Sequence, residues 1–166
     1  MMSFLRKHRF TLSANIHSGA EVVNYPWDFT FELHADDDWY RFISREYADE
    51  AMAVDPGYMF GWPENGITNG AEWYIVKDGR QDYVNYYLEG REVTLELSNE
   101  KLLGSEYLEA FWNKNKRSLI NYMSQCLYGI RGVVTDADNK EPLCARIHIP
   151  GHDSTYSVVH STTTHG

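Results

Sequence analysis

The sequence is short of basic residues and of long apolar runs, and each shortage excludes a class of protein. Fifteen Lys and Arg against 24 Asp and Glu give a formal net charge of −9. We therefore expect no nucleic-acid partner, because such a protein needs a basic face to neutralise phosphates. No run approaches the roughly 18 apolar residues of a membrane span, so none is expected. The basic start, with Arg6, Lys7 and Arg9, lacks the apolar stretch of a signal peptide. Taken as it stands, the chain is expected to be soluble and not secreted.

Cysteine is also scarce, with only Cys126 and Cys144. Two cysteines are too few for a disulfide framework, and they lack the Cys-x-x-Cys spacing of a redox or metal motif. One bridge between them and two buried thiols both remain open, so the redox compartment is undecided. Apolar material is plentiful, since 43% of the residues are hydrophobic and 14% are aromatic. We expect a packed core and order over most of the length.

Alternation of apolar and polar residues predicts two strands, at 10–17 and 91–98. In the second strand Val93, Leu95 and Leu97 fall on one side of the pleat. Glutamate, threonine and serine side chains fall on the other side. This strand therefore separates an apolar face from a polar face, which is where chemistry would lie.

Apolar residues at helical spacing predict two helices, at 36–53 and 105–125. We expect a polar, aromatic loop at 19–33 and a loop rich in glycine and proline at 54–71. The expected caps are Asp36 and Ser105, and the expected apolar sides are Trp39, Phe42, Ile43 and Tyr47 in the first helix and Leu108, Phe111, Trp112, Leu119, Ile120 and Met123 in the second.

The pattern of the sequence changes after Gly129, where short strand patterns follow one another without a helix. The predicted strands lie at 130–135, 143–149 and 155–161. Short strands at such spacing are typical of a β-sandwich or barrel. Because about 38 residues are too few to complete one, we expect the domain to continue beyond Gly166.

Two residues, Glu96 and His17, are candidate functional residues because of their positions in the predicted strands. Glu96 is a carboxylate on the polar face of its strand, where a catalytic role and a solvated strand face are both open. Glu92 shares that face, but four residues of strand separate the two by about 13 Å. Carboxylate pairs of glycosidases lie at about 5 to 9.5 Å, so a two-carboxylate hydrolase is not expected. His17 ends a strand before Ser18-Gly19, which suits a ligand or base as well as a structural histidine.

The other histidines are expected to be solvated. His34-Ala-Asp-Asp37 has the outline of a short metal motif but lies at an acidic helix start. No glycine-rich phosphate loop or nucleophile elbow is present. The residues alone indicate an α/β chain, with a hydrolytic role open. The histidines expected at the surface near the end of the chain are His148, His152, His160 and His165.

Three segments read together resemble the zinc metallocarboxypeptidases, in the branch that includes carboxypeptidases N, E and D. They are Leu12-Ser-Ala-Asn-Ile-His17-Ser-Gly with Asn24-Tyr-Pro-Trp-Asp28, Gly66-Ile-Thr-Asn-Gly-Ala-Glu-Trp-Tyr74, and Val93-Thr-Leu-Glu96-Leu-Ser98. Their order and spacing match the family pattern. Gly129-Ile-Arg-Gly-Val-Val134 resembles the start of the transthyretin-like β-sandwich that follows the catalytic domain in this branch.

The resemblance implies a partial mixed-sheet α/β domain at 1–127, the later half of a carboxypeptidase catalytic domain. It implies the first strands of a transthyretin-like sandwich at 128–166. It also implies Zn²⁺ as the cofactor and a peptide or protein C-terminus as the substrate, with C-terminal Arg or Lys preferred. Full-length members of the family suggest a secreted or periplasmic protein, while this chain leaves the compartment undecided.

The family's roles fall on five residues of this sequence. His17 would be a zinc ligand, and Glu96 would be the general base and acid. Tyr74 would close over the peptide's C-terminus. Asp28 would be the acid of the side-chain pocket, and Gln81 would occupy a neighbouring pocket position.

One departure from the family pattern governs the expected activity. The family's other two zinc ligands lie in a His-x-x-Glu segment, which these 166 residues do not contain. A catalytic zinc site takes three protein ligands and a water. We therefore expect a truncated, inactive fragment with weak or no zinc binding, and self-association through an exposed sheet edge. The alternatives are a non-catalytic peptide-binding or assembly module, and an unstable remnant of a disrupted gene.

Overall fold

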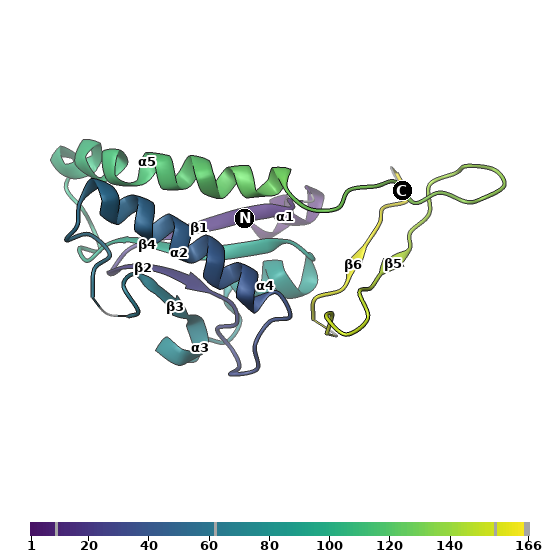
Figure 1. Cartoon of the computed structure of the whole chain (residues 1–166), viewed down its shortest axis with the longest axis horizontal. Coiled ribbons are helices and arrows are strands. Elements are labelled where there is room, and N and C mark those ends of the chain that lie inside the picture. Colours follow the sequence, from purple (N-terminus) through teal and green to yellow (C-terminus); the bar gives the residue numbers. More distant parts are fainter. Residues whose placement is uncertain (9, 62, 155, 165–166) are drawn as a thin grey trace.

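The structure is a computed structural model that describes residues 1–8, 10–61, 63–154 and 156–164. Its main sheet has four strands in the order β1-β4-β2-β3 (Figure 1). The strands are β1 (Leu12–His17), β2 (Ala20–Tyr25), β3 (Ile67–Asn69) and β4 (Arg91–Ser98). β4 pairs in parallel with β1 and antiparallel with β2, and β2 pairs in parallel with β3. The sheet is therefore mixed, as predicted.

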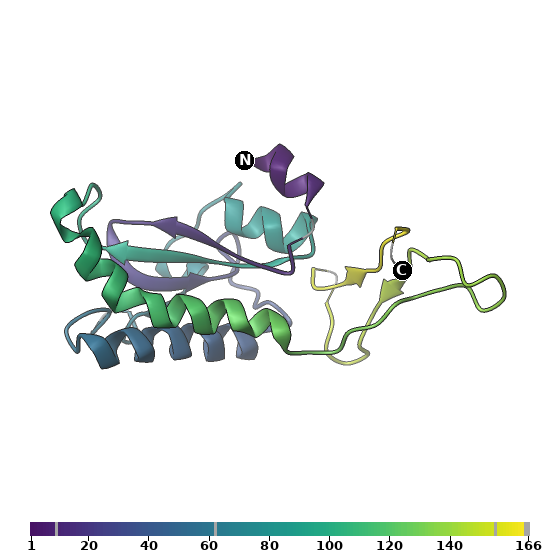
Figure 2. The same ribbon diagram turned by 90° about the horizontal axis from the view of Figure 1, so that it is seen from above.

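Two long helices, α2 (Asp37–Val54) and α5 (Leu108–Ser124), lie side by side on one face of this sheet (Figure 2). The short helices are α1 (Met2–Lys7), α3 (Gly70–Trp73) and α4 (Arg80–Tyr87), together with 3₁₀ turns η1 (Ser105–Tyr107) and η2 (Gln125–Leu127). Burial of apolar area between α2, α5 and the sheet drives this packing, at roughly 25 cal/mol per Å². The core side chains include Val23, Tyr25, Tyr40, Ile43, Tyr47, Ile67, Val93, Leu95 and Tyr122.

The strongest sequence patterns are confirmed. The strand predicted at 91–98 is β4, the strand at 10–17 is β1, and the helix at 36–53 is α2. The details of the helices are corrected. The carboxylate of Asp36 bonds to Arg91 and makes no hydrogen bond to the helix start. Ser105 begins the 3₁₀ turn and makes no capping hydrogen bond. Expected core residues that are exposed instead are Phe42, Leu108, Trp112, Ile120 and Met123.

Two predicted loops hold regular structure. The loop expected at 19–33 contains β2, whose adjacent residues Val22 and Val23 are both buried. β2 lacks the alternation of apolar and polar residues that predicts a strand, because both of its faces are covered. The loop expected at 54–71 contains β3 and the start of α3, and α4 was not predicted.

The C-terminal part forms a second, two-stranded sheet of β5 (Arg146–Ile147) and β6 (Val159–His160). The strand predicted at 130–135 is wrong, because only an isolated bridge from Thr135 to Pro142 forms. Ile130 is fully exposed, so its β-branched side chain has no face to pack against. The strands predicted at 143–149 and 155–161 are each only two residues long in the structure. Thr155 lies outside the described residues. The sandwich stays a prediction.

Two further observations bear on the expectations from the sequence. Cys126 and Cys144 are both free and exposed, so neither a bridge between them nor a pair of buried thiols is present. Among the described residues, no helix combines the length and the apolar character that crossing a bilayer requires.

Candidate active site and acid pocket

His17 and Glu96 meet at the end of the two parallel strands. β1 and β4 pair so that these residues are opposite each other, and His17 Nδ1 lies 3.0 Å from Glu96 Oε2. The His17 side chain is 61% exposed, whereas that of Glu96 is 8% exposed. A largely buried carboxylate thus contacts an imidazole that is open to a ligand.

The polar face of β4 is covered, which excludes the solvated strand face considered for Glu96. Glu92, Thr94, Glu96 and Ser98 are all buried. Glu92 Oε2 accepts hydrogen bonds from Ser13 Oγ at 2.6 Å and from the Arg80 guanidinium at 2.9 Å. Burial raises the pKa of the Glu92 carboxyl. Partnered carboxylates therefore line this face, instead of water-exposed ones.

Asp28 and Gln81 belong to a separate cluster of buried polar side chains, which we call the acid pocket after the side-chain pocket that the resemblance implied. Asp28 is 6% exposed, and its Oδ1 accepts from Asn24 Nδ2 at 3.0 Å and from Gln81 Nε2 at 3.1 Å. Burial raises the pKa of the Asp28 carboxyl. Gly70 is required beside it, because a Cβ there would lie 1.8 Å from Asp28 Oδ1. The contact between Asp28 and Gln81 is the neighbourhood that the resemblance implied.

Hydrogen-bond acceptors outnumber donors in this pocket. Asn24 Oδ1 and Gln81 Oε1 are buried and have no hydrogen-bond partner among the described residues. Each amide donates one N–H to Asp28 Oδ1 and leaves its own oxygen unpaired beside that carboxylate. Such a cluster suits a group that brings several N–H donors and a positive charge.

Asp82, which was not among the predicted site residues, anchors this pocket. Its carboxylate accepts from the backbone N–H of Asp28, at 3.1 and 3.2 Å, and of Phe29 at 3.0 Å. Burial raises the pKa of Asp82 to about 7, and the nearby charge of Asp28 contributes. A carboxylate in the first turn of α4 was the available signal, but α4 was not predicted.

Tyr74 follows the C-terminus of α3 and is exposed. Its backbone N–H donates to Gly70 O at 3.0 Å, and its ring packs against Trp73. Val76 N–H donates to Asp28 O at 3.0 Å, which ties the segment after Tyr74 to the acid pocket. The tyrosine thus lies on a segment attached to the pocket, with its own ring open to solvent.

The described residues do not form a complete zinc site. His17 offers an imidazole, but no group of three His, Cys, Asp or Glu side chains among the described residues could hold a metal ion. A catalytic zinc needs three such ligands. His34, expected to be solvated at a helix start, is instead 3% exposed.

The C-terminal histidines fall as follows. His148 and His152 are exposed, as expected, and both lie near Asp153. His160 is half-buried because it bonds to Glu89. His165 lies outside the described residues.

Comparison with known proteins supports one family. A family model described as zinc carboxypeptidase matches residues 1–118. Carboxypeptidase SOL1 of Arabidopsis thaliana is 34% identical over 162 residues, covering 93% of this chain and 32% of that protein. Human carboxypeptidase D is 38% identical over 162 residues, covering 90% and 12%. Carboxypeptidase E of Caenorhabditis elegans is 34% identical over 174 residues, covering 93% and 37%. The chain spans well under half the length of each of these relatives.

Proposed function

The chain belongs to the zinc carboxypeptidase family, and we propose that it supplies the later half of an active site that removes C-terminal Arg or Lys from peptides or proteins. The observation that carries this proposal is the 3.0 Å contact of His17 with the buried Glu96. A hydrolase of this kind needs a proton carrier beside a metal ligand, and these two side chains supply that pair.

The two halves of the proposed chemistry fall on different residues. Glu96 takes a proton from the attacking water and passes it to the leaving amine. His17 is one of three protein ligands of a Zn²⁺ ion, whose other two ligands come from a segment that carries His-x-x-Glu. The zinc ion, when bound, supplies Lewis acidity at this place. Tyr74 swings from its exposed position to cover the peptide's C-terminus.

Selection of basic residues is proposed to come from the acid pocket. Asp28 offers a buried negative charge, and the surplus acceptors of Asn24 and Gln81 lie beside it. A guanidinium brings five N–H donors in a rigid fork, and an ammonium brings three. Either group would satisfy oxygens that otherwise stay unpaired, whereas an apolar side chain would not.

Four further features belong to the same proposal. Without the His-x-x-Glu segment, residues 1–166 bind zinc weakly and hydrolyse nothing. β1 is one of the two edge strands of the main sheet and is a site of self-association. Residues 128–166 begin a transthyretin-like sandwich. The complete enzyme works outside the cytoplasm, in a secreted or periplasmic setting.

The proposal is tested by joining residues 1–166, in one polypeptide, to an upstream half of a similar carboxypeptidase that carries His-x-x-Glu. We expect this joined enzyme to release C-terminal Arg faster than C-terminal Leu from otherwise identical peptides, and to stop when a chelator removes zinc. A properly folded, zinc-loaded joined enzyme that released neither residue would refute the proposed hydrolysis. Equal release of Arg and Leu would refute the specificity.

A second function rests on the acid pocket alone. Asp28, Gln81 and Gly70 build that pocket from this chain's own residues, without a metal. A non-catalytic module could therefore hold basic peptide ends. Calorimetric titration of the chain with a peptide ending in Arg, in the presence of a chelator, would support this function if binding persists and is lost in Asp28→Asn.

A further inference from the structure

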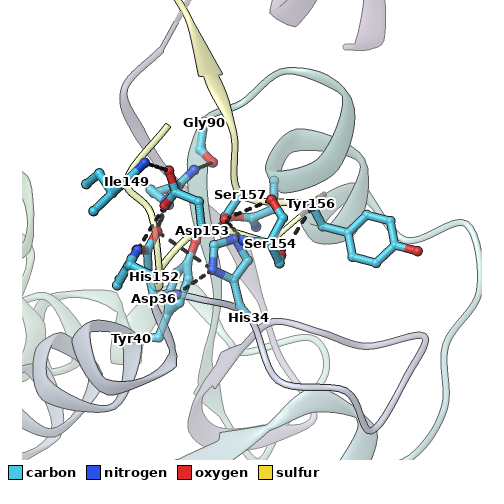
Figure 3. Close-up of polar contacts among 12 residues, drawn as sticks. His34, Asp36, Tyr40, Gly90, Ile149, His152, Asp153, Ser154, Tyr156 and Ser157 are labelled. Atoms are coloured by element: carbon cyan, nitrogen blue, oxygen red, sulfur yellow. Dashed lines mark hydrogen bonds and ion pairs between the residues drawn. The ribbon is translucent and has the colours of Figure 1, made fainter. Parts of the chain in front are cut away.

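The C-terminal segment covers a buried histidine of the domain that carries the site. His34 is 3% exposed, and Figure 3 draws its ring among Asp153, Ser154 and Ser157. On its other sides the ring packs against Trp27 and Tyr40, at centroid distances of 4.9 and 5.2 Å. We call residues 148–154 and 156–161 the clasp, because this segment lies over the histidine.

Contacts at both ends hold the clasp in place. His152 Nε2 lies 3.4 Å from Asp36 Oδ1. The backbone N–H of His160 donates to Glu89 at 2.8 Å, and its Nδ1 lies 2.6 Å from the same carboxylate. Between these two anchors, the rings of Tyr156 and Tyr86 lie 5.1 Å apart. The clasp is therefore docked by ion pairs and ring packing, without a long strand pairing to the main sheet.

The hydrogen bonding of His34 fixes where its protons can go. The backbone N–H of Asp36 donates to His34 Nδ1 at 2.9 Å, so the single proton of the neutral ring is on Nε2. Nε2 is buried and has no partner among the described residues. A second proton would have to bind Nδ1, where it would meet the Asp36 N–H. The charged ring therefore cannot keep its present contacts.

Charged groups from three segments face this ring. Arg91 of β4 and His152 of the clasp add positive charge, while Asp36 and Asp153 add negative charge. Asp36 is already committed, because its carboxylate lies 2.7 Å from the Arg91 guanidinium. Asp153 is likewise shared, at 2.9 Å from His152 and 3.7 Å from His148. Tyr40 is uncharged, and the carboxylate nearest to His34 among the described residues, Asp36 with Oδ2 at 3.7 Å from Nδ1, is shared with Arg91.

We propose that the clasp is released in acid, because His34 takes up a proton once the clasp no longer covers it. Release would hydrate the ring and free the Asp36 N–H to bond elsewhere. It would also uncover Trp27, whose ring lies 6.3 Å from that of Tyr156 and which directly precedes Asp28. Release of the clasp would therefore change the surroundings of the acid pocket at Asp28.

The sign of the pH dependence follows from the two histidines. Burial, followed by the charge of Arg91, lowers the pKa of His34 to about 4, against 6.5 for a free histidine. Between these values the released state binds the extra proton, so each unit of falling pH shifts the equilibrium about tenfold towards release. The bond to Asp153 raises the pKa of His152 most but lies within the clasp and survives release, so His152 opposes this shift only through its contact with Asp36. The His152 side chain is 44% exposed, so solvent weakens this opposing contribution.

The test is a pH titration of the whole chain by NMR from pH 8 to 4.5, following backbone amides and histidine ring signals. We expect the clasp amides to shift together with the His34 ring, while the amides of β4 stay in place. His34→Asn keeps an acceptor for the Asp36 N–H but cannot be charged, so its clasp amides should lose that transition. His152→Gln removes the titratable side chain that favours the docked clasp in acid. The clasp of this variant should therefore be released at a higher pH than the clasp of wild type.

Each outcome decides the proposal. Clasp amides that shift at the same pH in wild type and His34→Asn would overturn it, as would a His34 ring that titrates while the clasp amides stay fixed. Simultaneous loss of the β4 signals would mean global unfolding and would also overturn it. If His34→Asn fails to fold, the coincidence of ring and clasp transitions in wild type decides. The test needs no peptidase activity, so it stands apart from the proposed function.

Discussion

At the residue scale, buried carboxylates with different partners are open to different substitutions. Among the described residues, the one polar contact of the Glu96 side chain is with the exposed His17, whereas Glu92 is bound by Ser13 and Arg80. Removing the charge of Glu92 would leave Arg80 without its ionic partner, so a loss of stability would mask any effect on chemistry. Glu96 lacks such a partner, so its substitution reports on chemistry.

Glu96→Gln in the joined enzyme should therefore lower turnover by about 10² to 10⁴-fold, the range that a positioned acid or base supplies. Bound zinc should remain, because the proposed role of Glu96 is to carry a proton. Turnover and zinc content per chain check this. Glu100→Gln, an exposed position just beyond the same strand, is the matched control and should behave as wild type. Full activity of Glu96→Gln would show that the proton carrier lies elsewhere.

Asp28→Asn in the joined enzyme should lower the preference for C-terminal Arg over Leu by about ten- to a hundredfold. That range corresponds to one hydrogen bond to a charged group, at about 1.5–3 kcal/mol. The ratio of kcat/KM for two peptides that differ only in the last residue measures it. Asp38→Asn removes one exposed charge of the same sign and should keep the ratio. An unchanged ratio in Asp28→Asn would reject this pocket as the source of specificity.

Asp82 predicts a pH dependence of stability. Because its pKa rises to about 7 on folding, from 3.8, the folded state binds a proton that the unfolded state lacks between these values. The contribution of Asp82 to the free energy of unfolding therefore falls as pH rises from about 4 to 7. Asp82→Asn lacks this fall, so its urea midpoint relative to wild type should rise between pH 5 and pH 8. A difference that stays constant with pH, as expected for Asp38→Asn, would contradict the assignment.

At the element scale, an element was predicted correctly where its two faces differ in polarity and was missed where they do not. β4 alternates because apolar core lies on one face and the polar site on the other, so its bounds were predicted to the residue. β2 carries two consecutive buried valines, and α4 has tyrosines around its surface, so neither shows the periodicity of a half-buried element.

The candidate site divides in the same way. Residues named from the family pattern were brought together where the strands pair them, as with His17 and Glu96, or where a loop meets a helix, as with Asp28 and Gln81. Asp82 was missed because its role depends on two backbone N–H groups, which no side-chain pattern records. The burial of His34 was missed because the residues that cover it come from the far end of the chain.

The open edge of β1 predicts self-association. β1 pairs with β4 along one side only, and Ile16 is 57% exposed near its end. An unpaired edge with an apolar side chain is a template for another chain. We expect Ile16→Lys to lower the mass measured by light scattering at a given concentration. Leu102→Lys, at an exposed loop position, is the matched control and should leave the mass unchanged. A wild-type chain that stays monomeric at high concentration would contradict the prediction.

At the scale of the whole molecule, the acid pocket and the metal site differ in how completely this chain forms them. The pocket has its carboxylate, its amide partners and the glycine that makes room for them. The proposed metal site has only His17, because no group of three His, Cys, Asp or Glu side chains among the described residues could hold a metal ion. We therefore expect substrate selection and metal binding to be separable, with the isolated chain performing the first without the second.

This separation predicts the behaviour of the isolated chain. Calorimetry should detect zinc binding at least 10²-fold weaker in residues 1–166 than in the joined enzyme, because the isolated chain lacks two of the three protein ligands that a catalytic zinc requires. Incubation of the chain with zinc and a peptide ending in Arg should release no arginine. The same peptide should still bind, and Asp28→Asn should abolish that binding. If the purified chain released arginine and lost this activity on chelation, the two missing ligands would have to come from residues within it. The assignment of His17 as the sole ligand in these 166 residues would then fail.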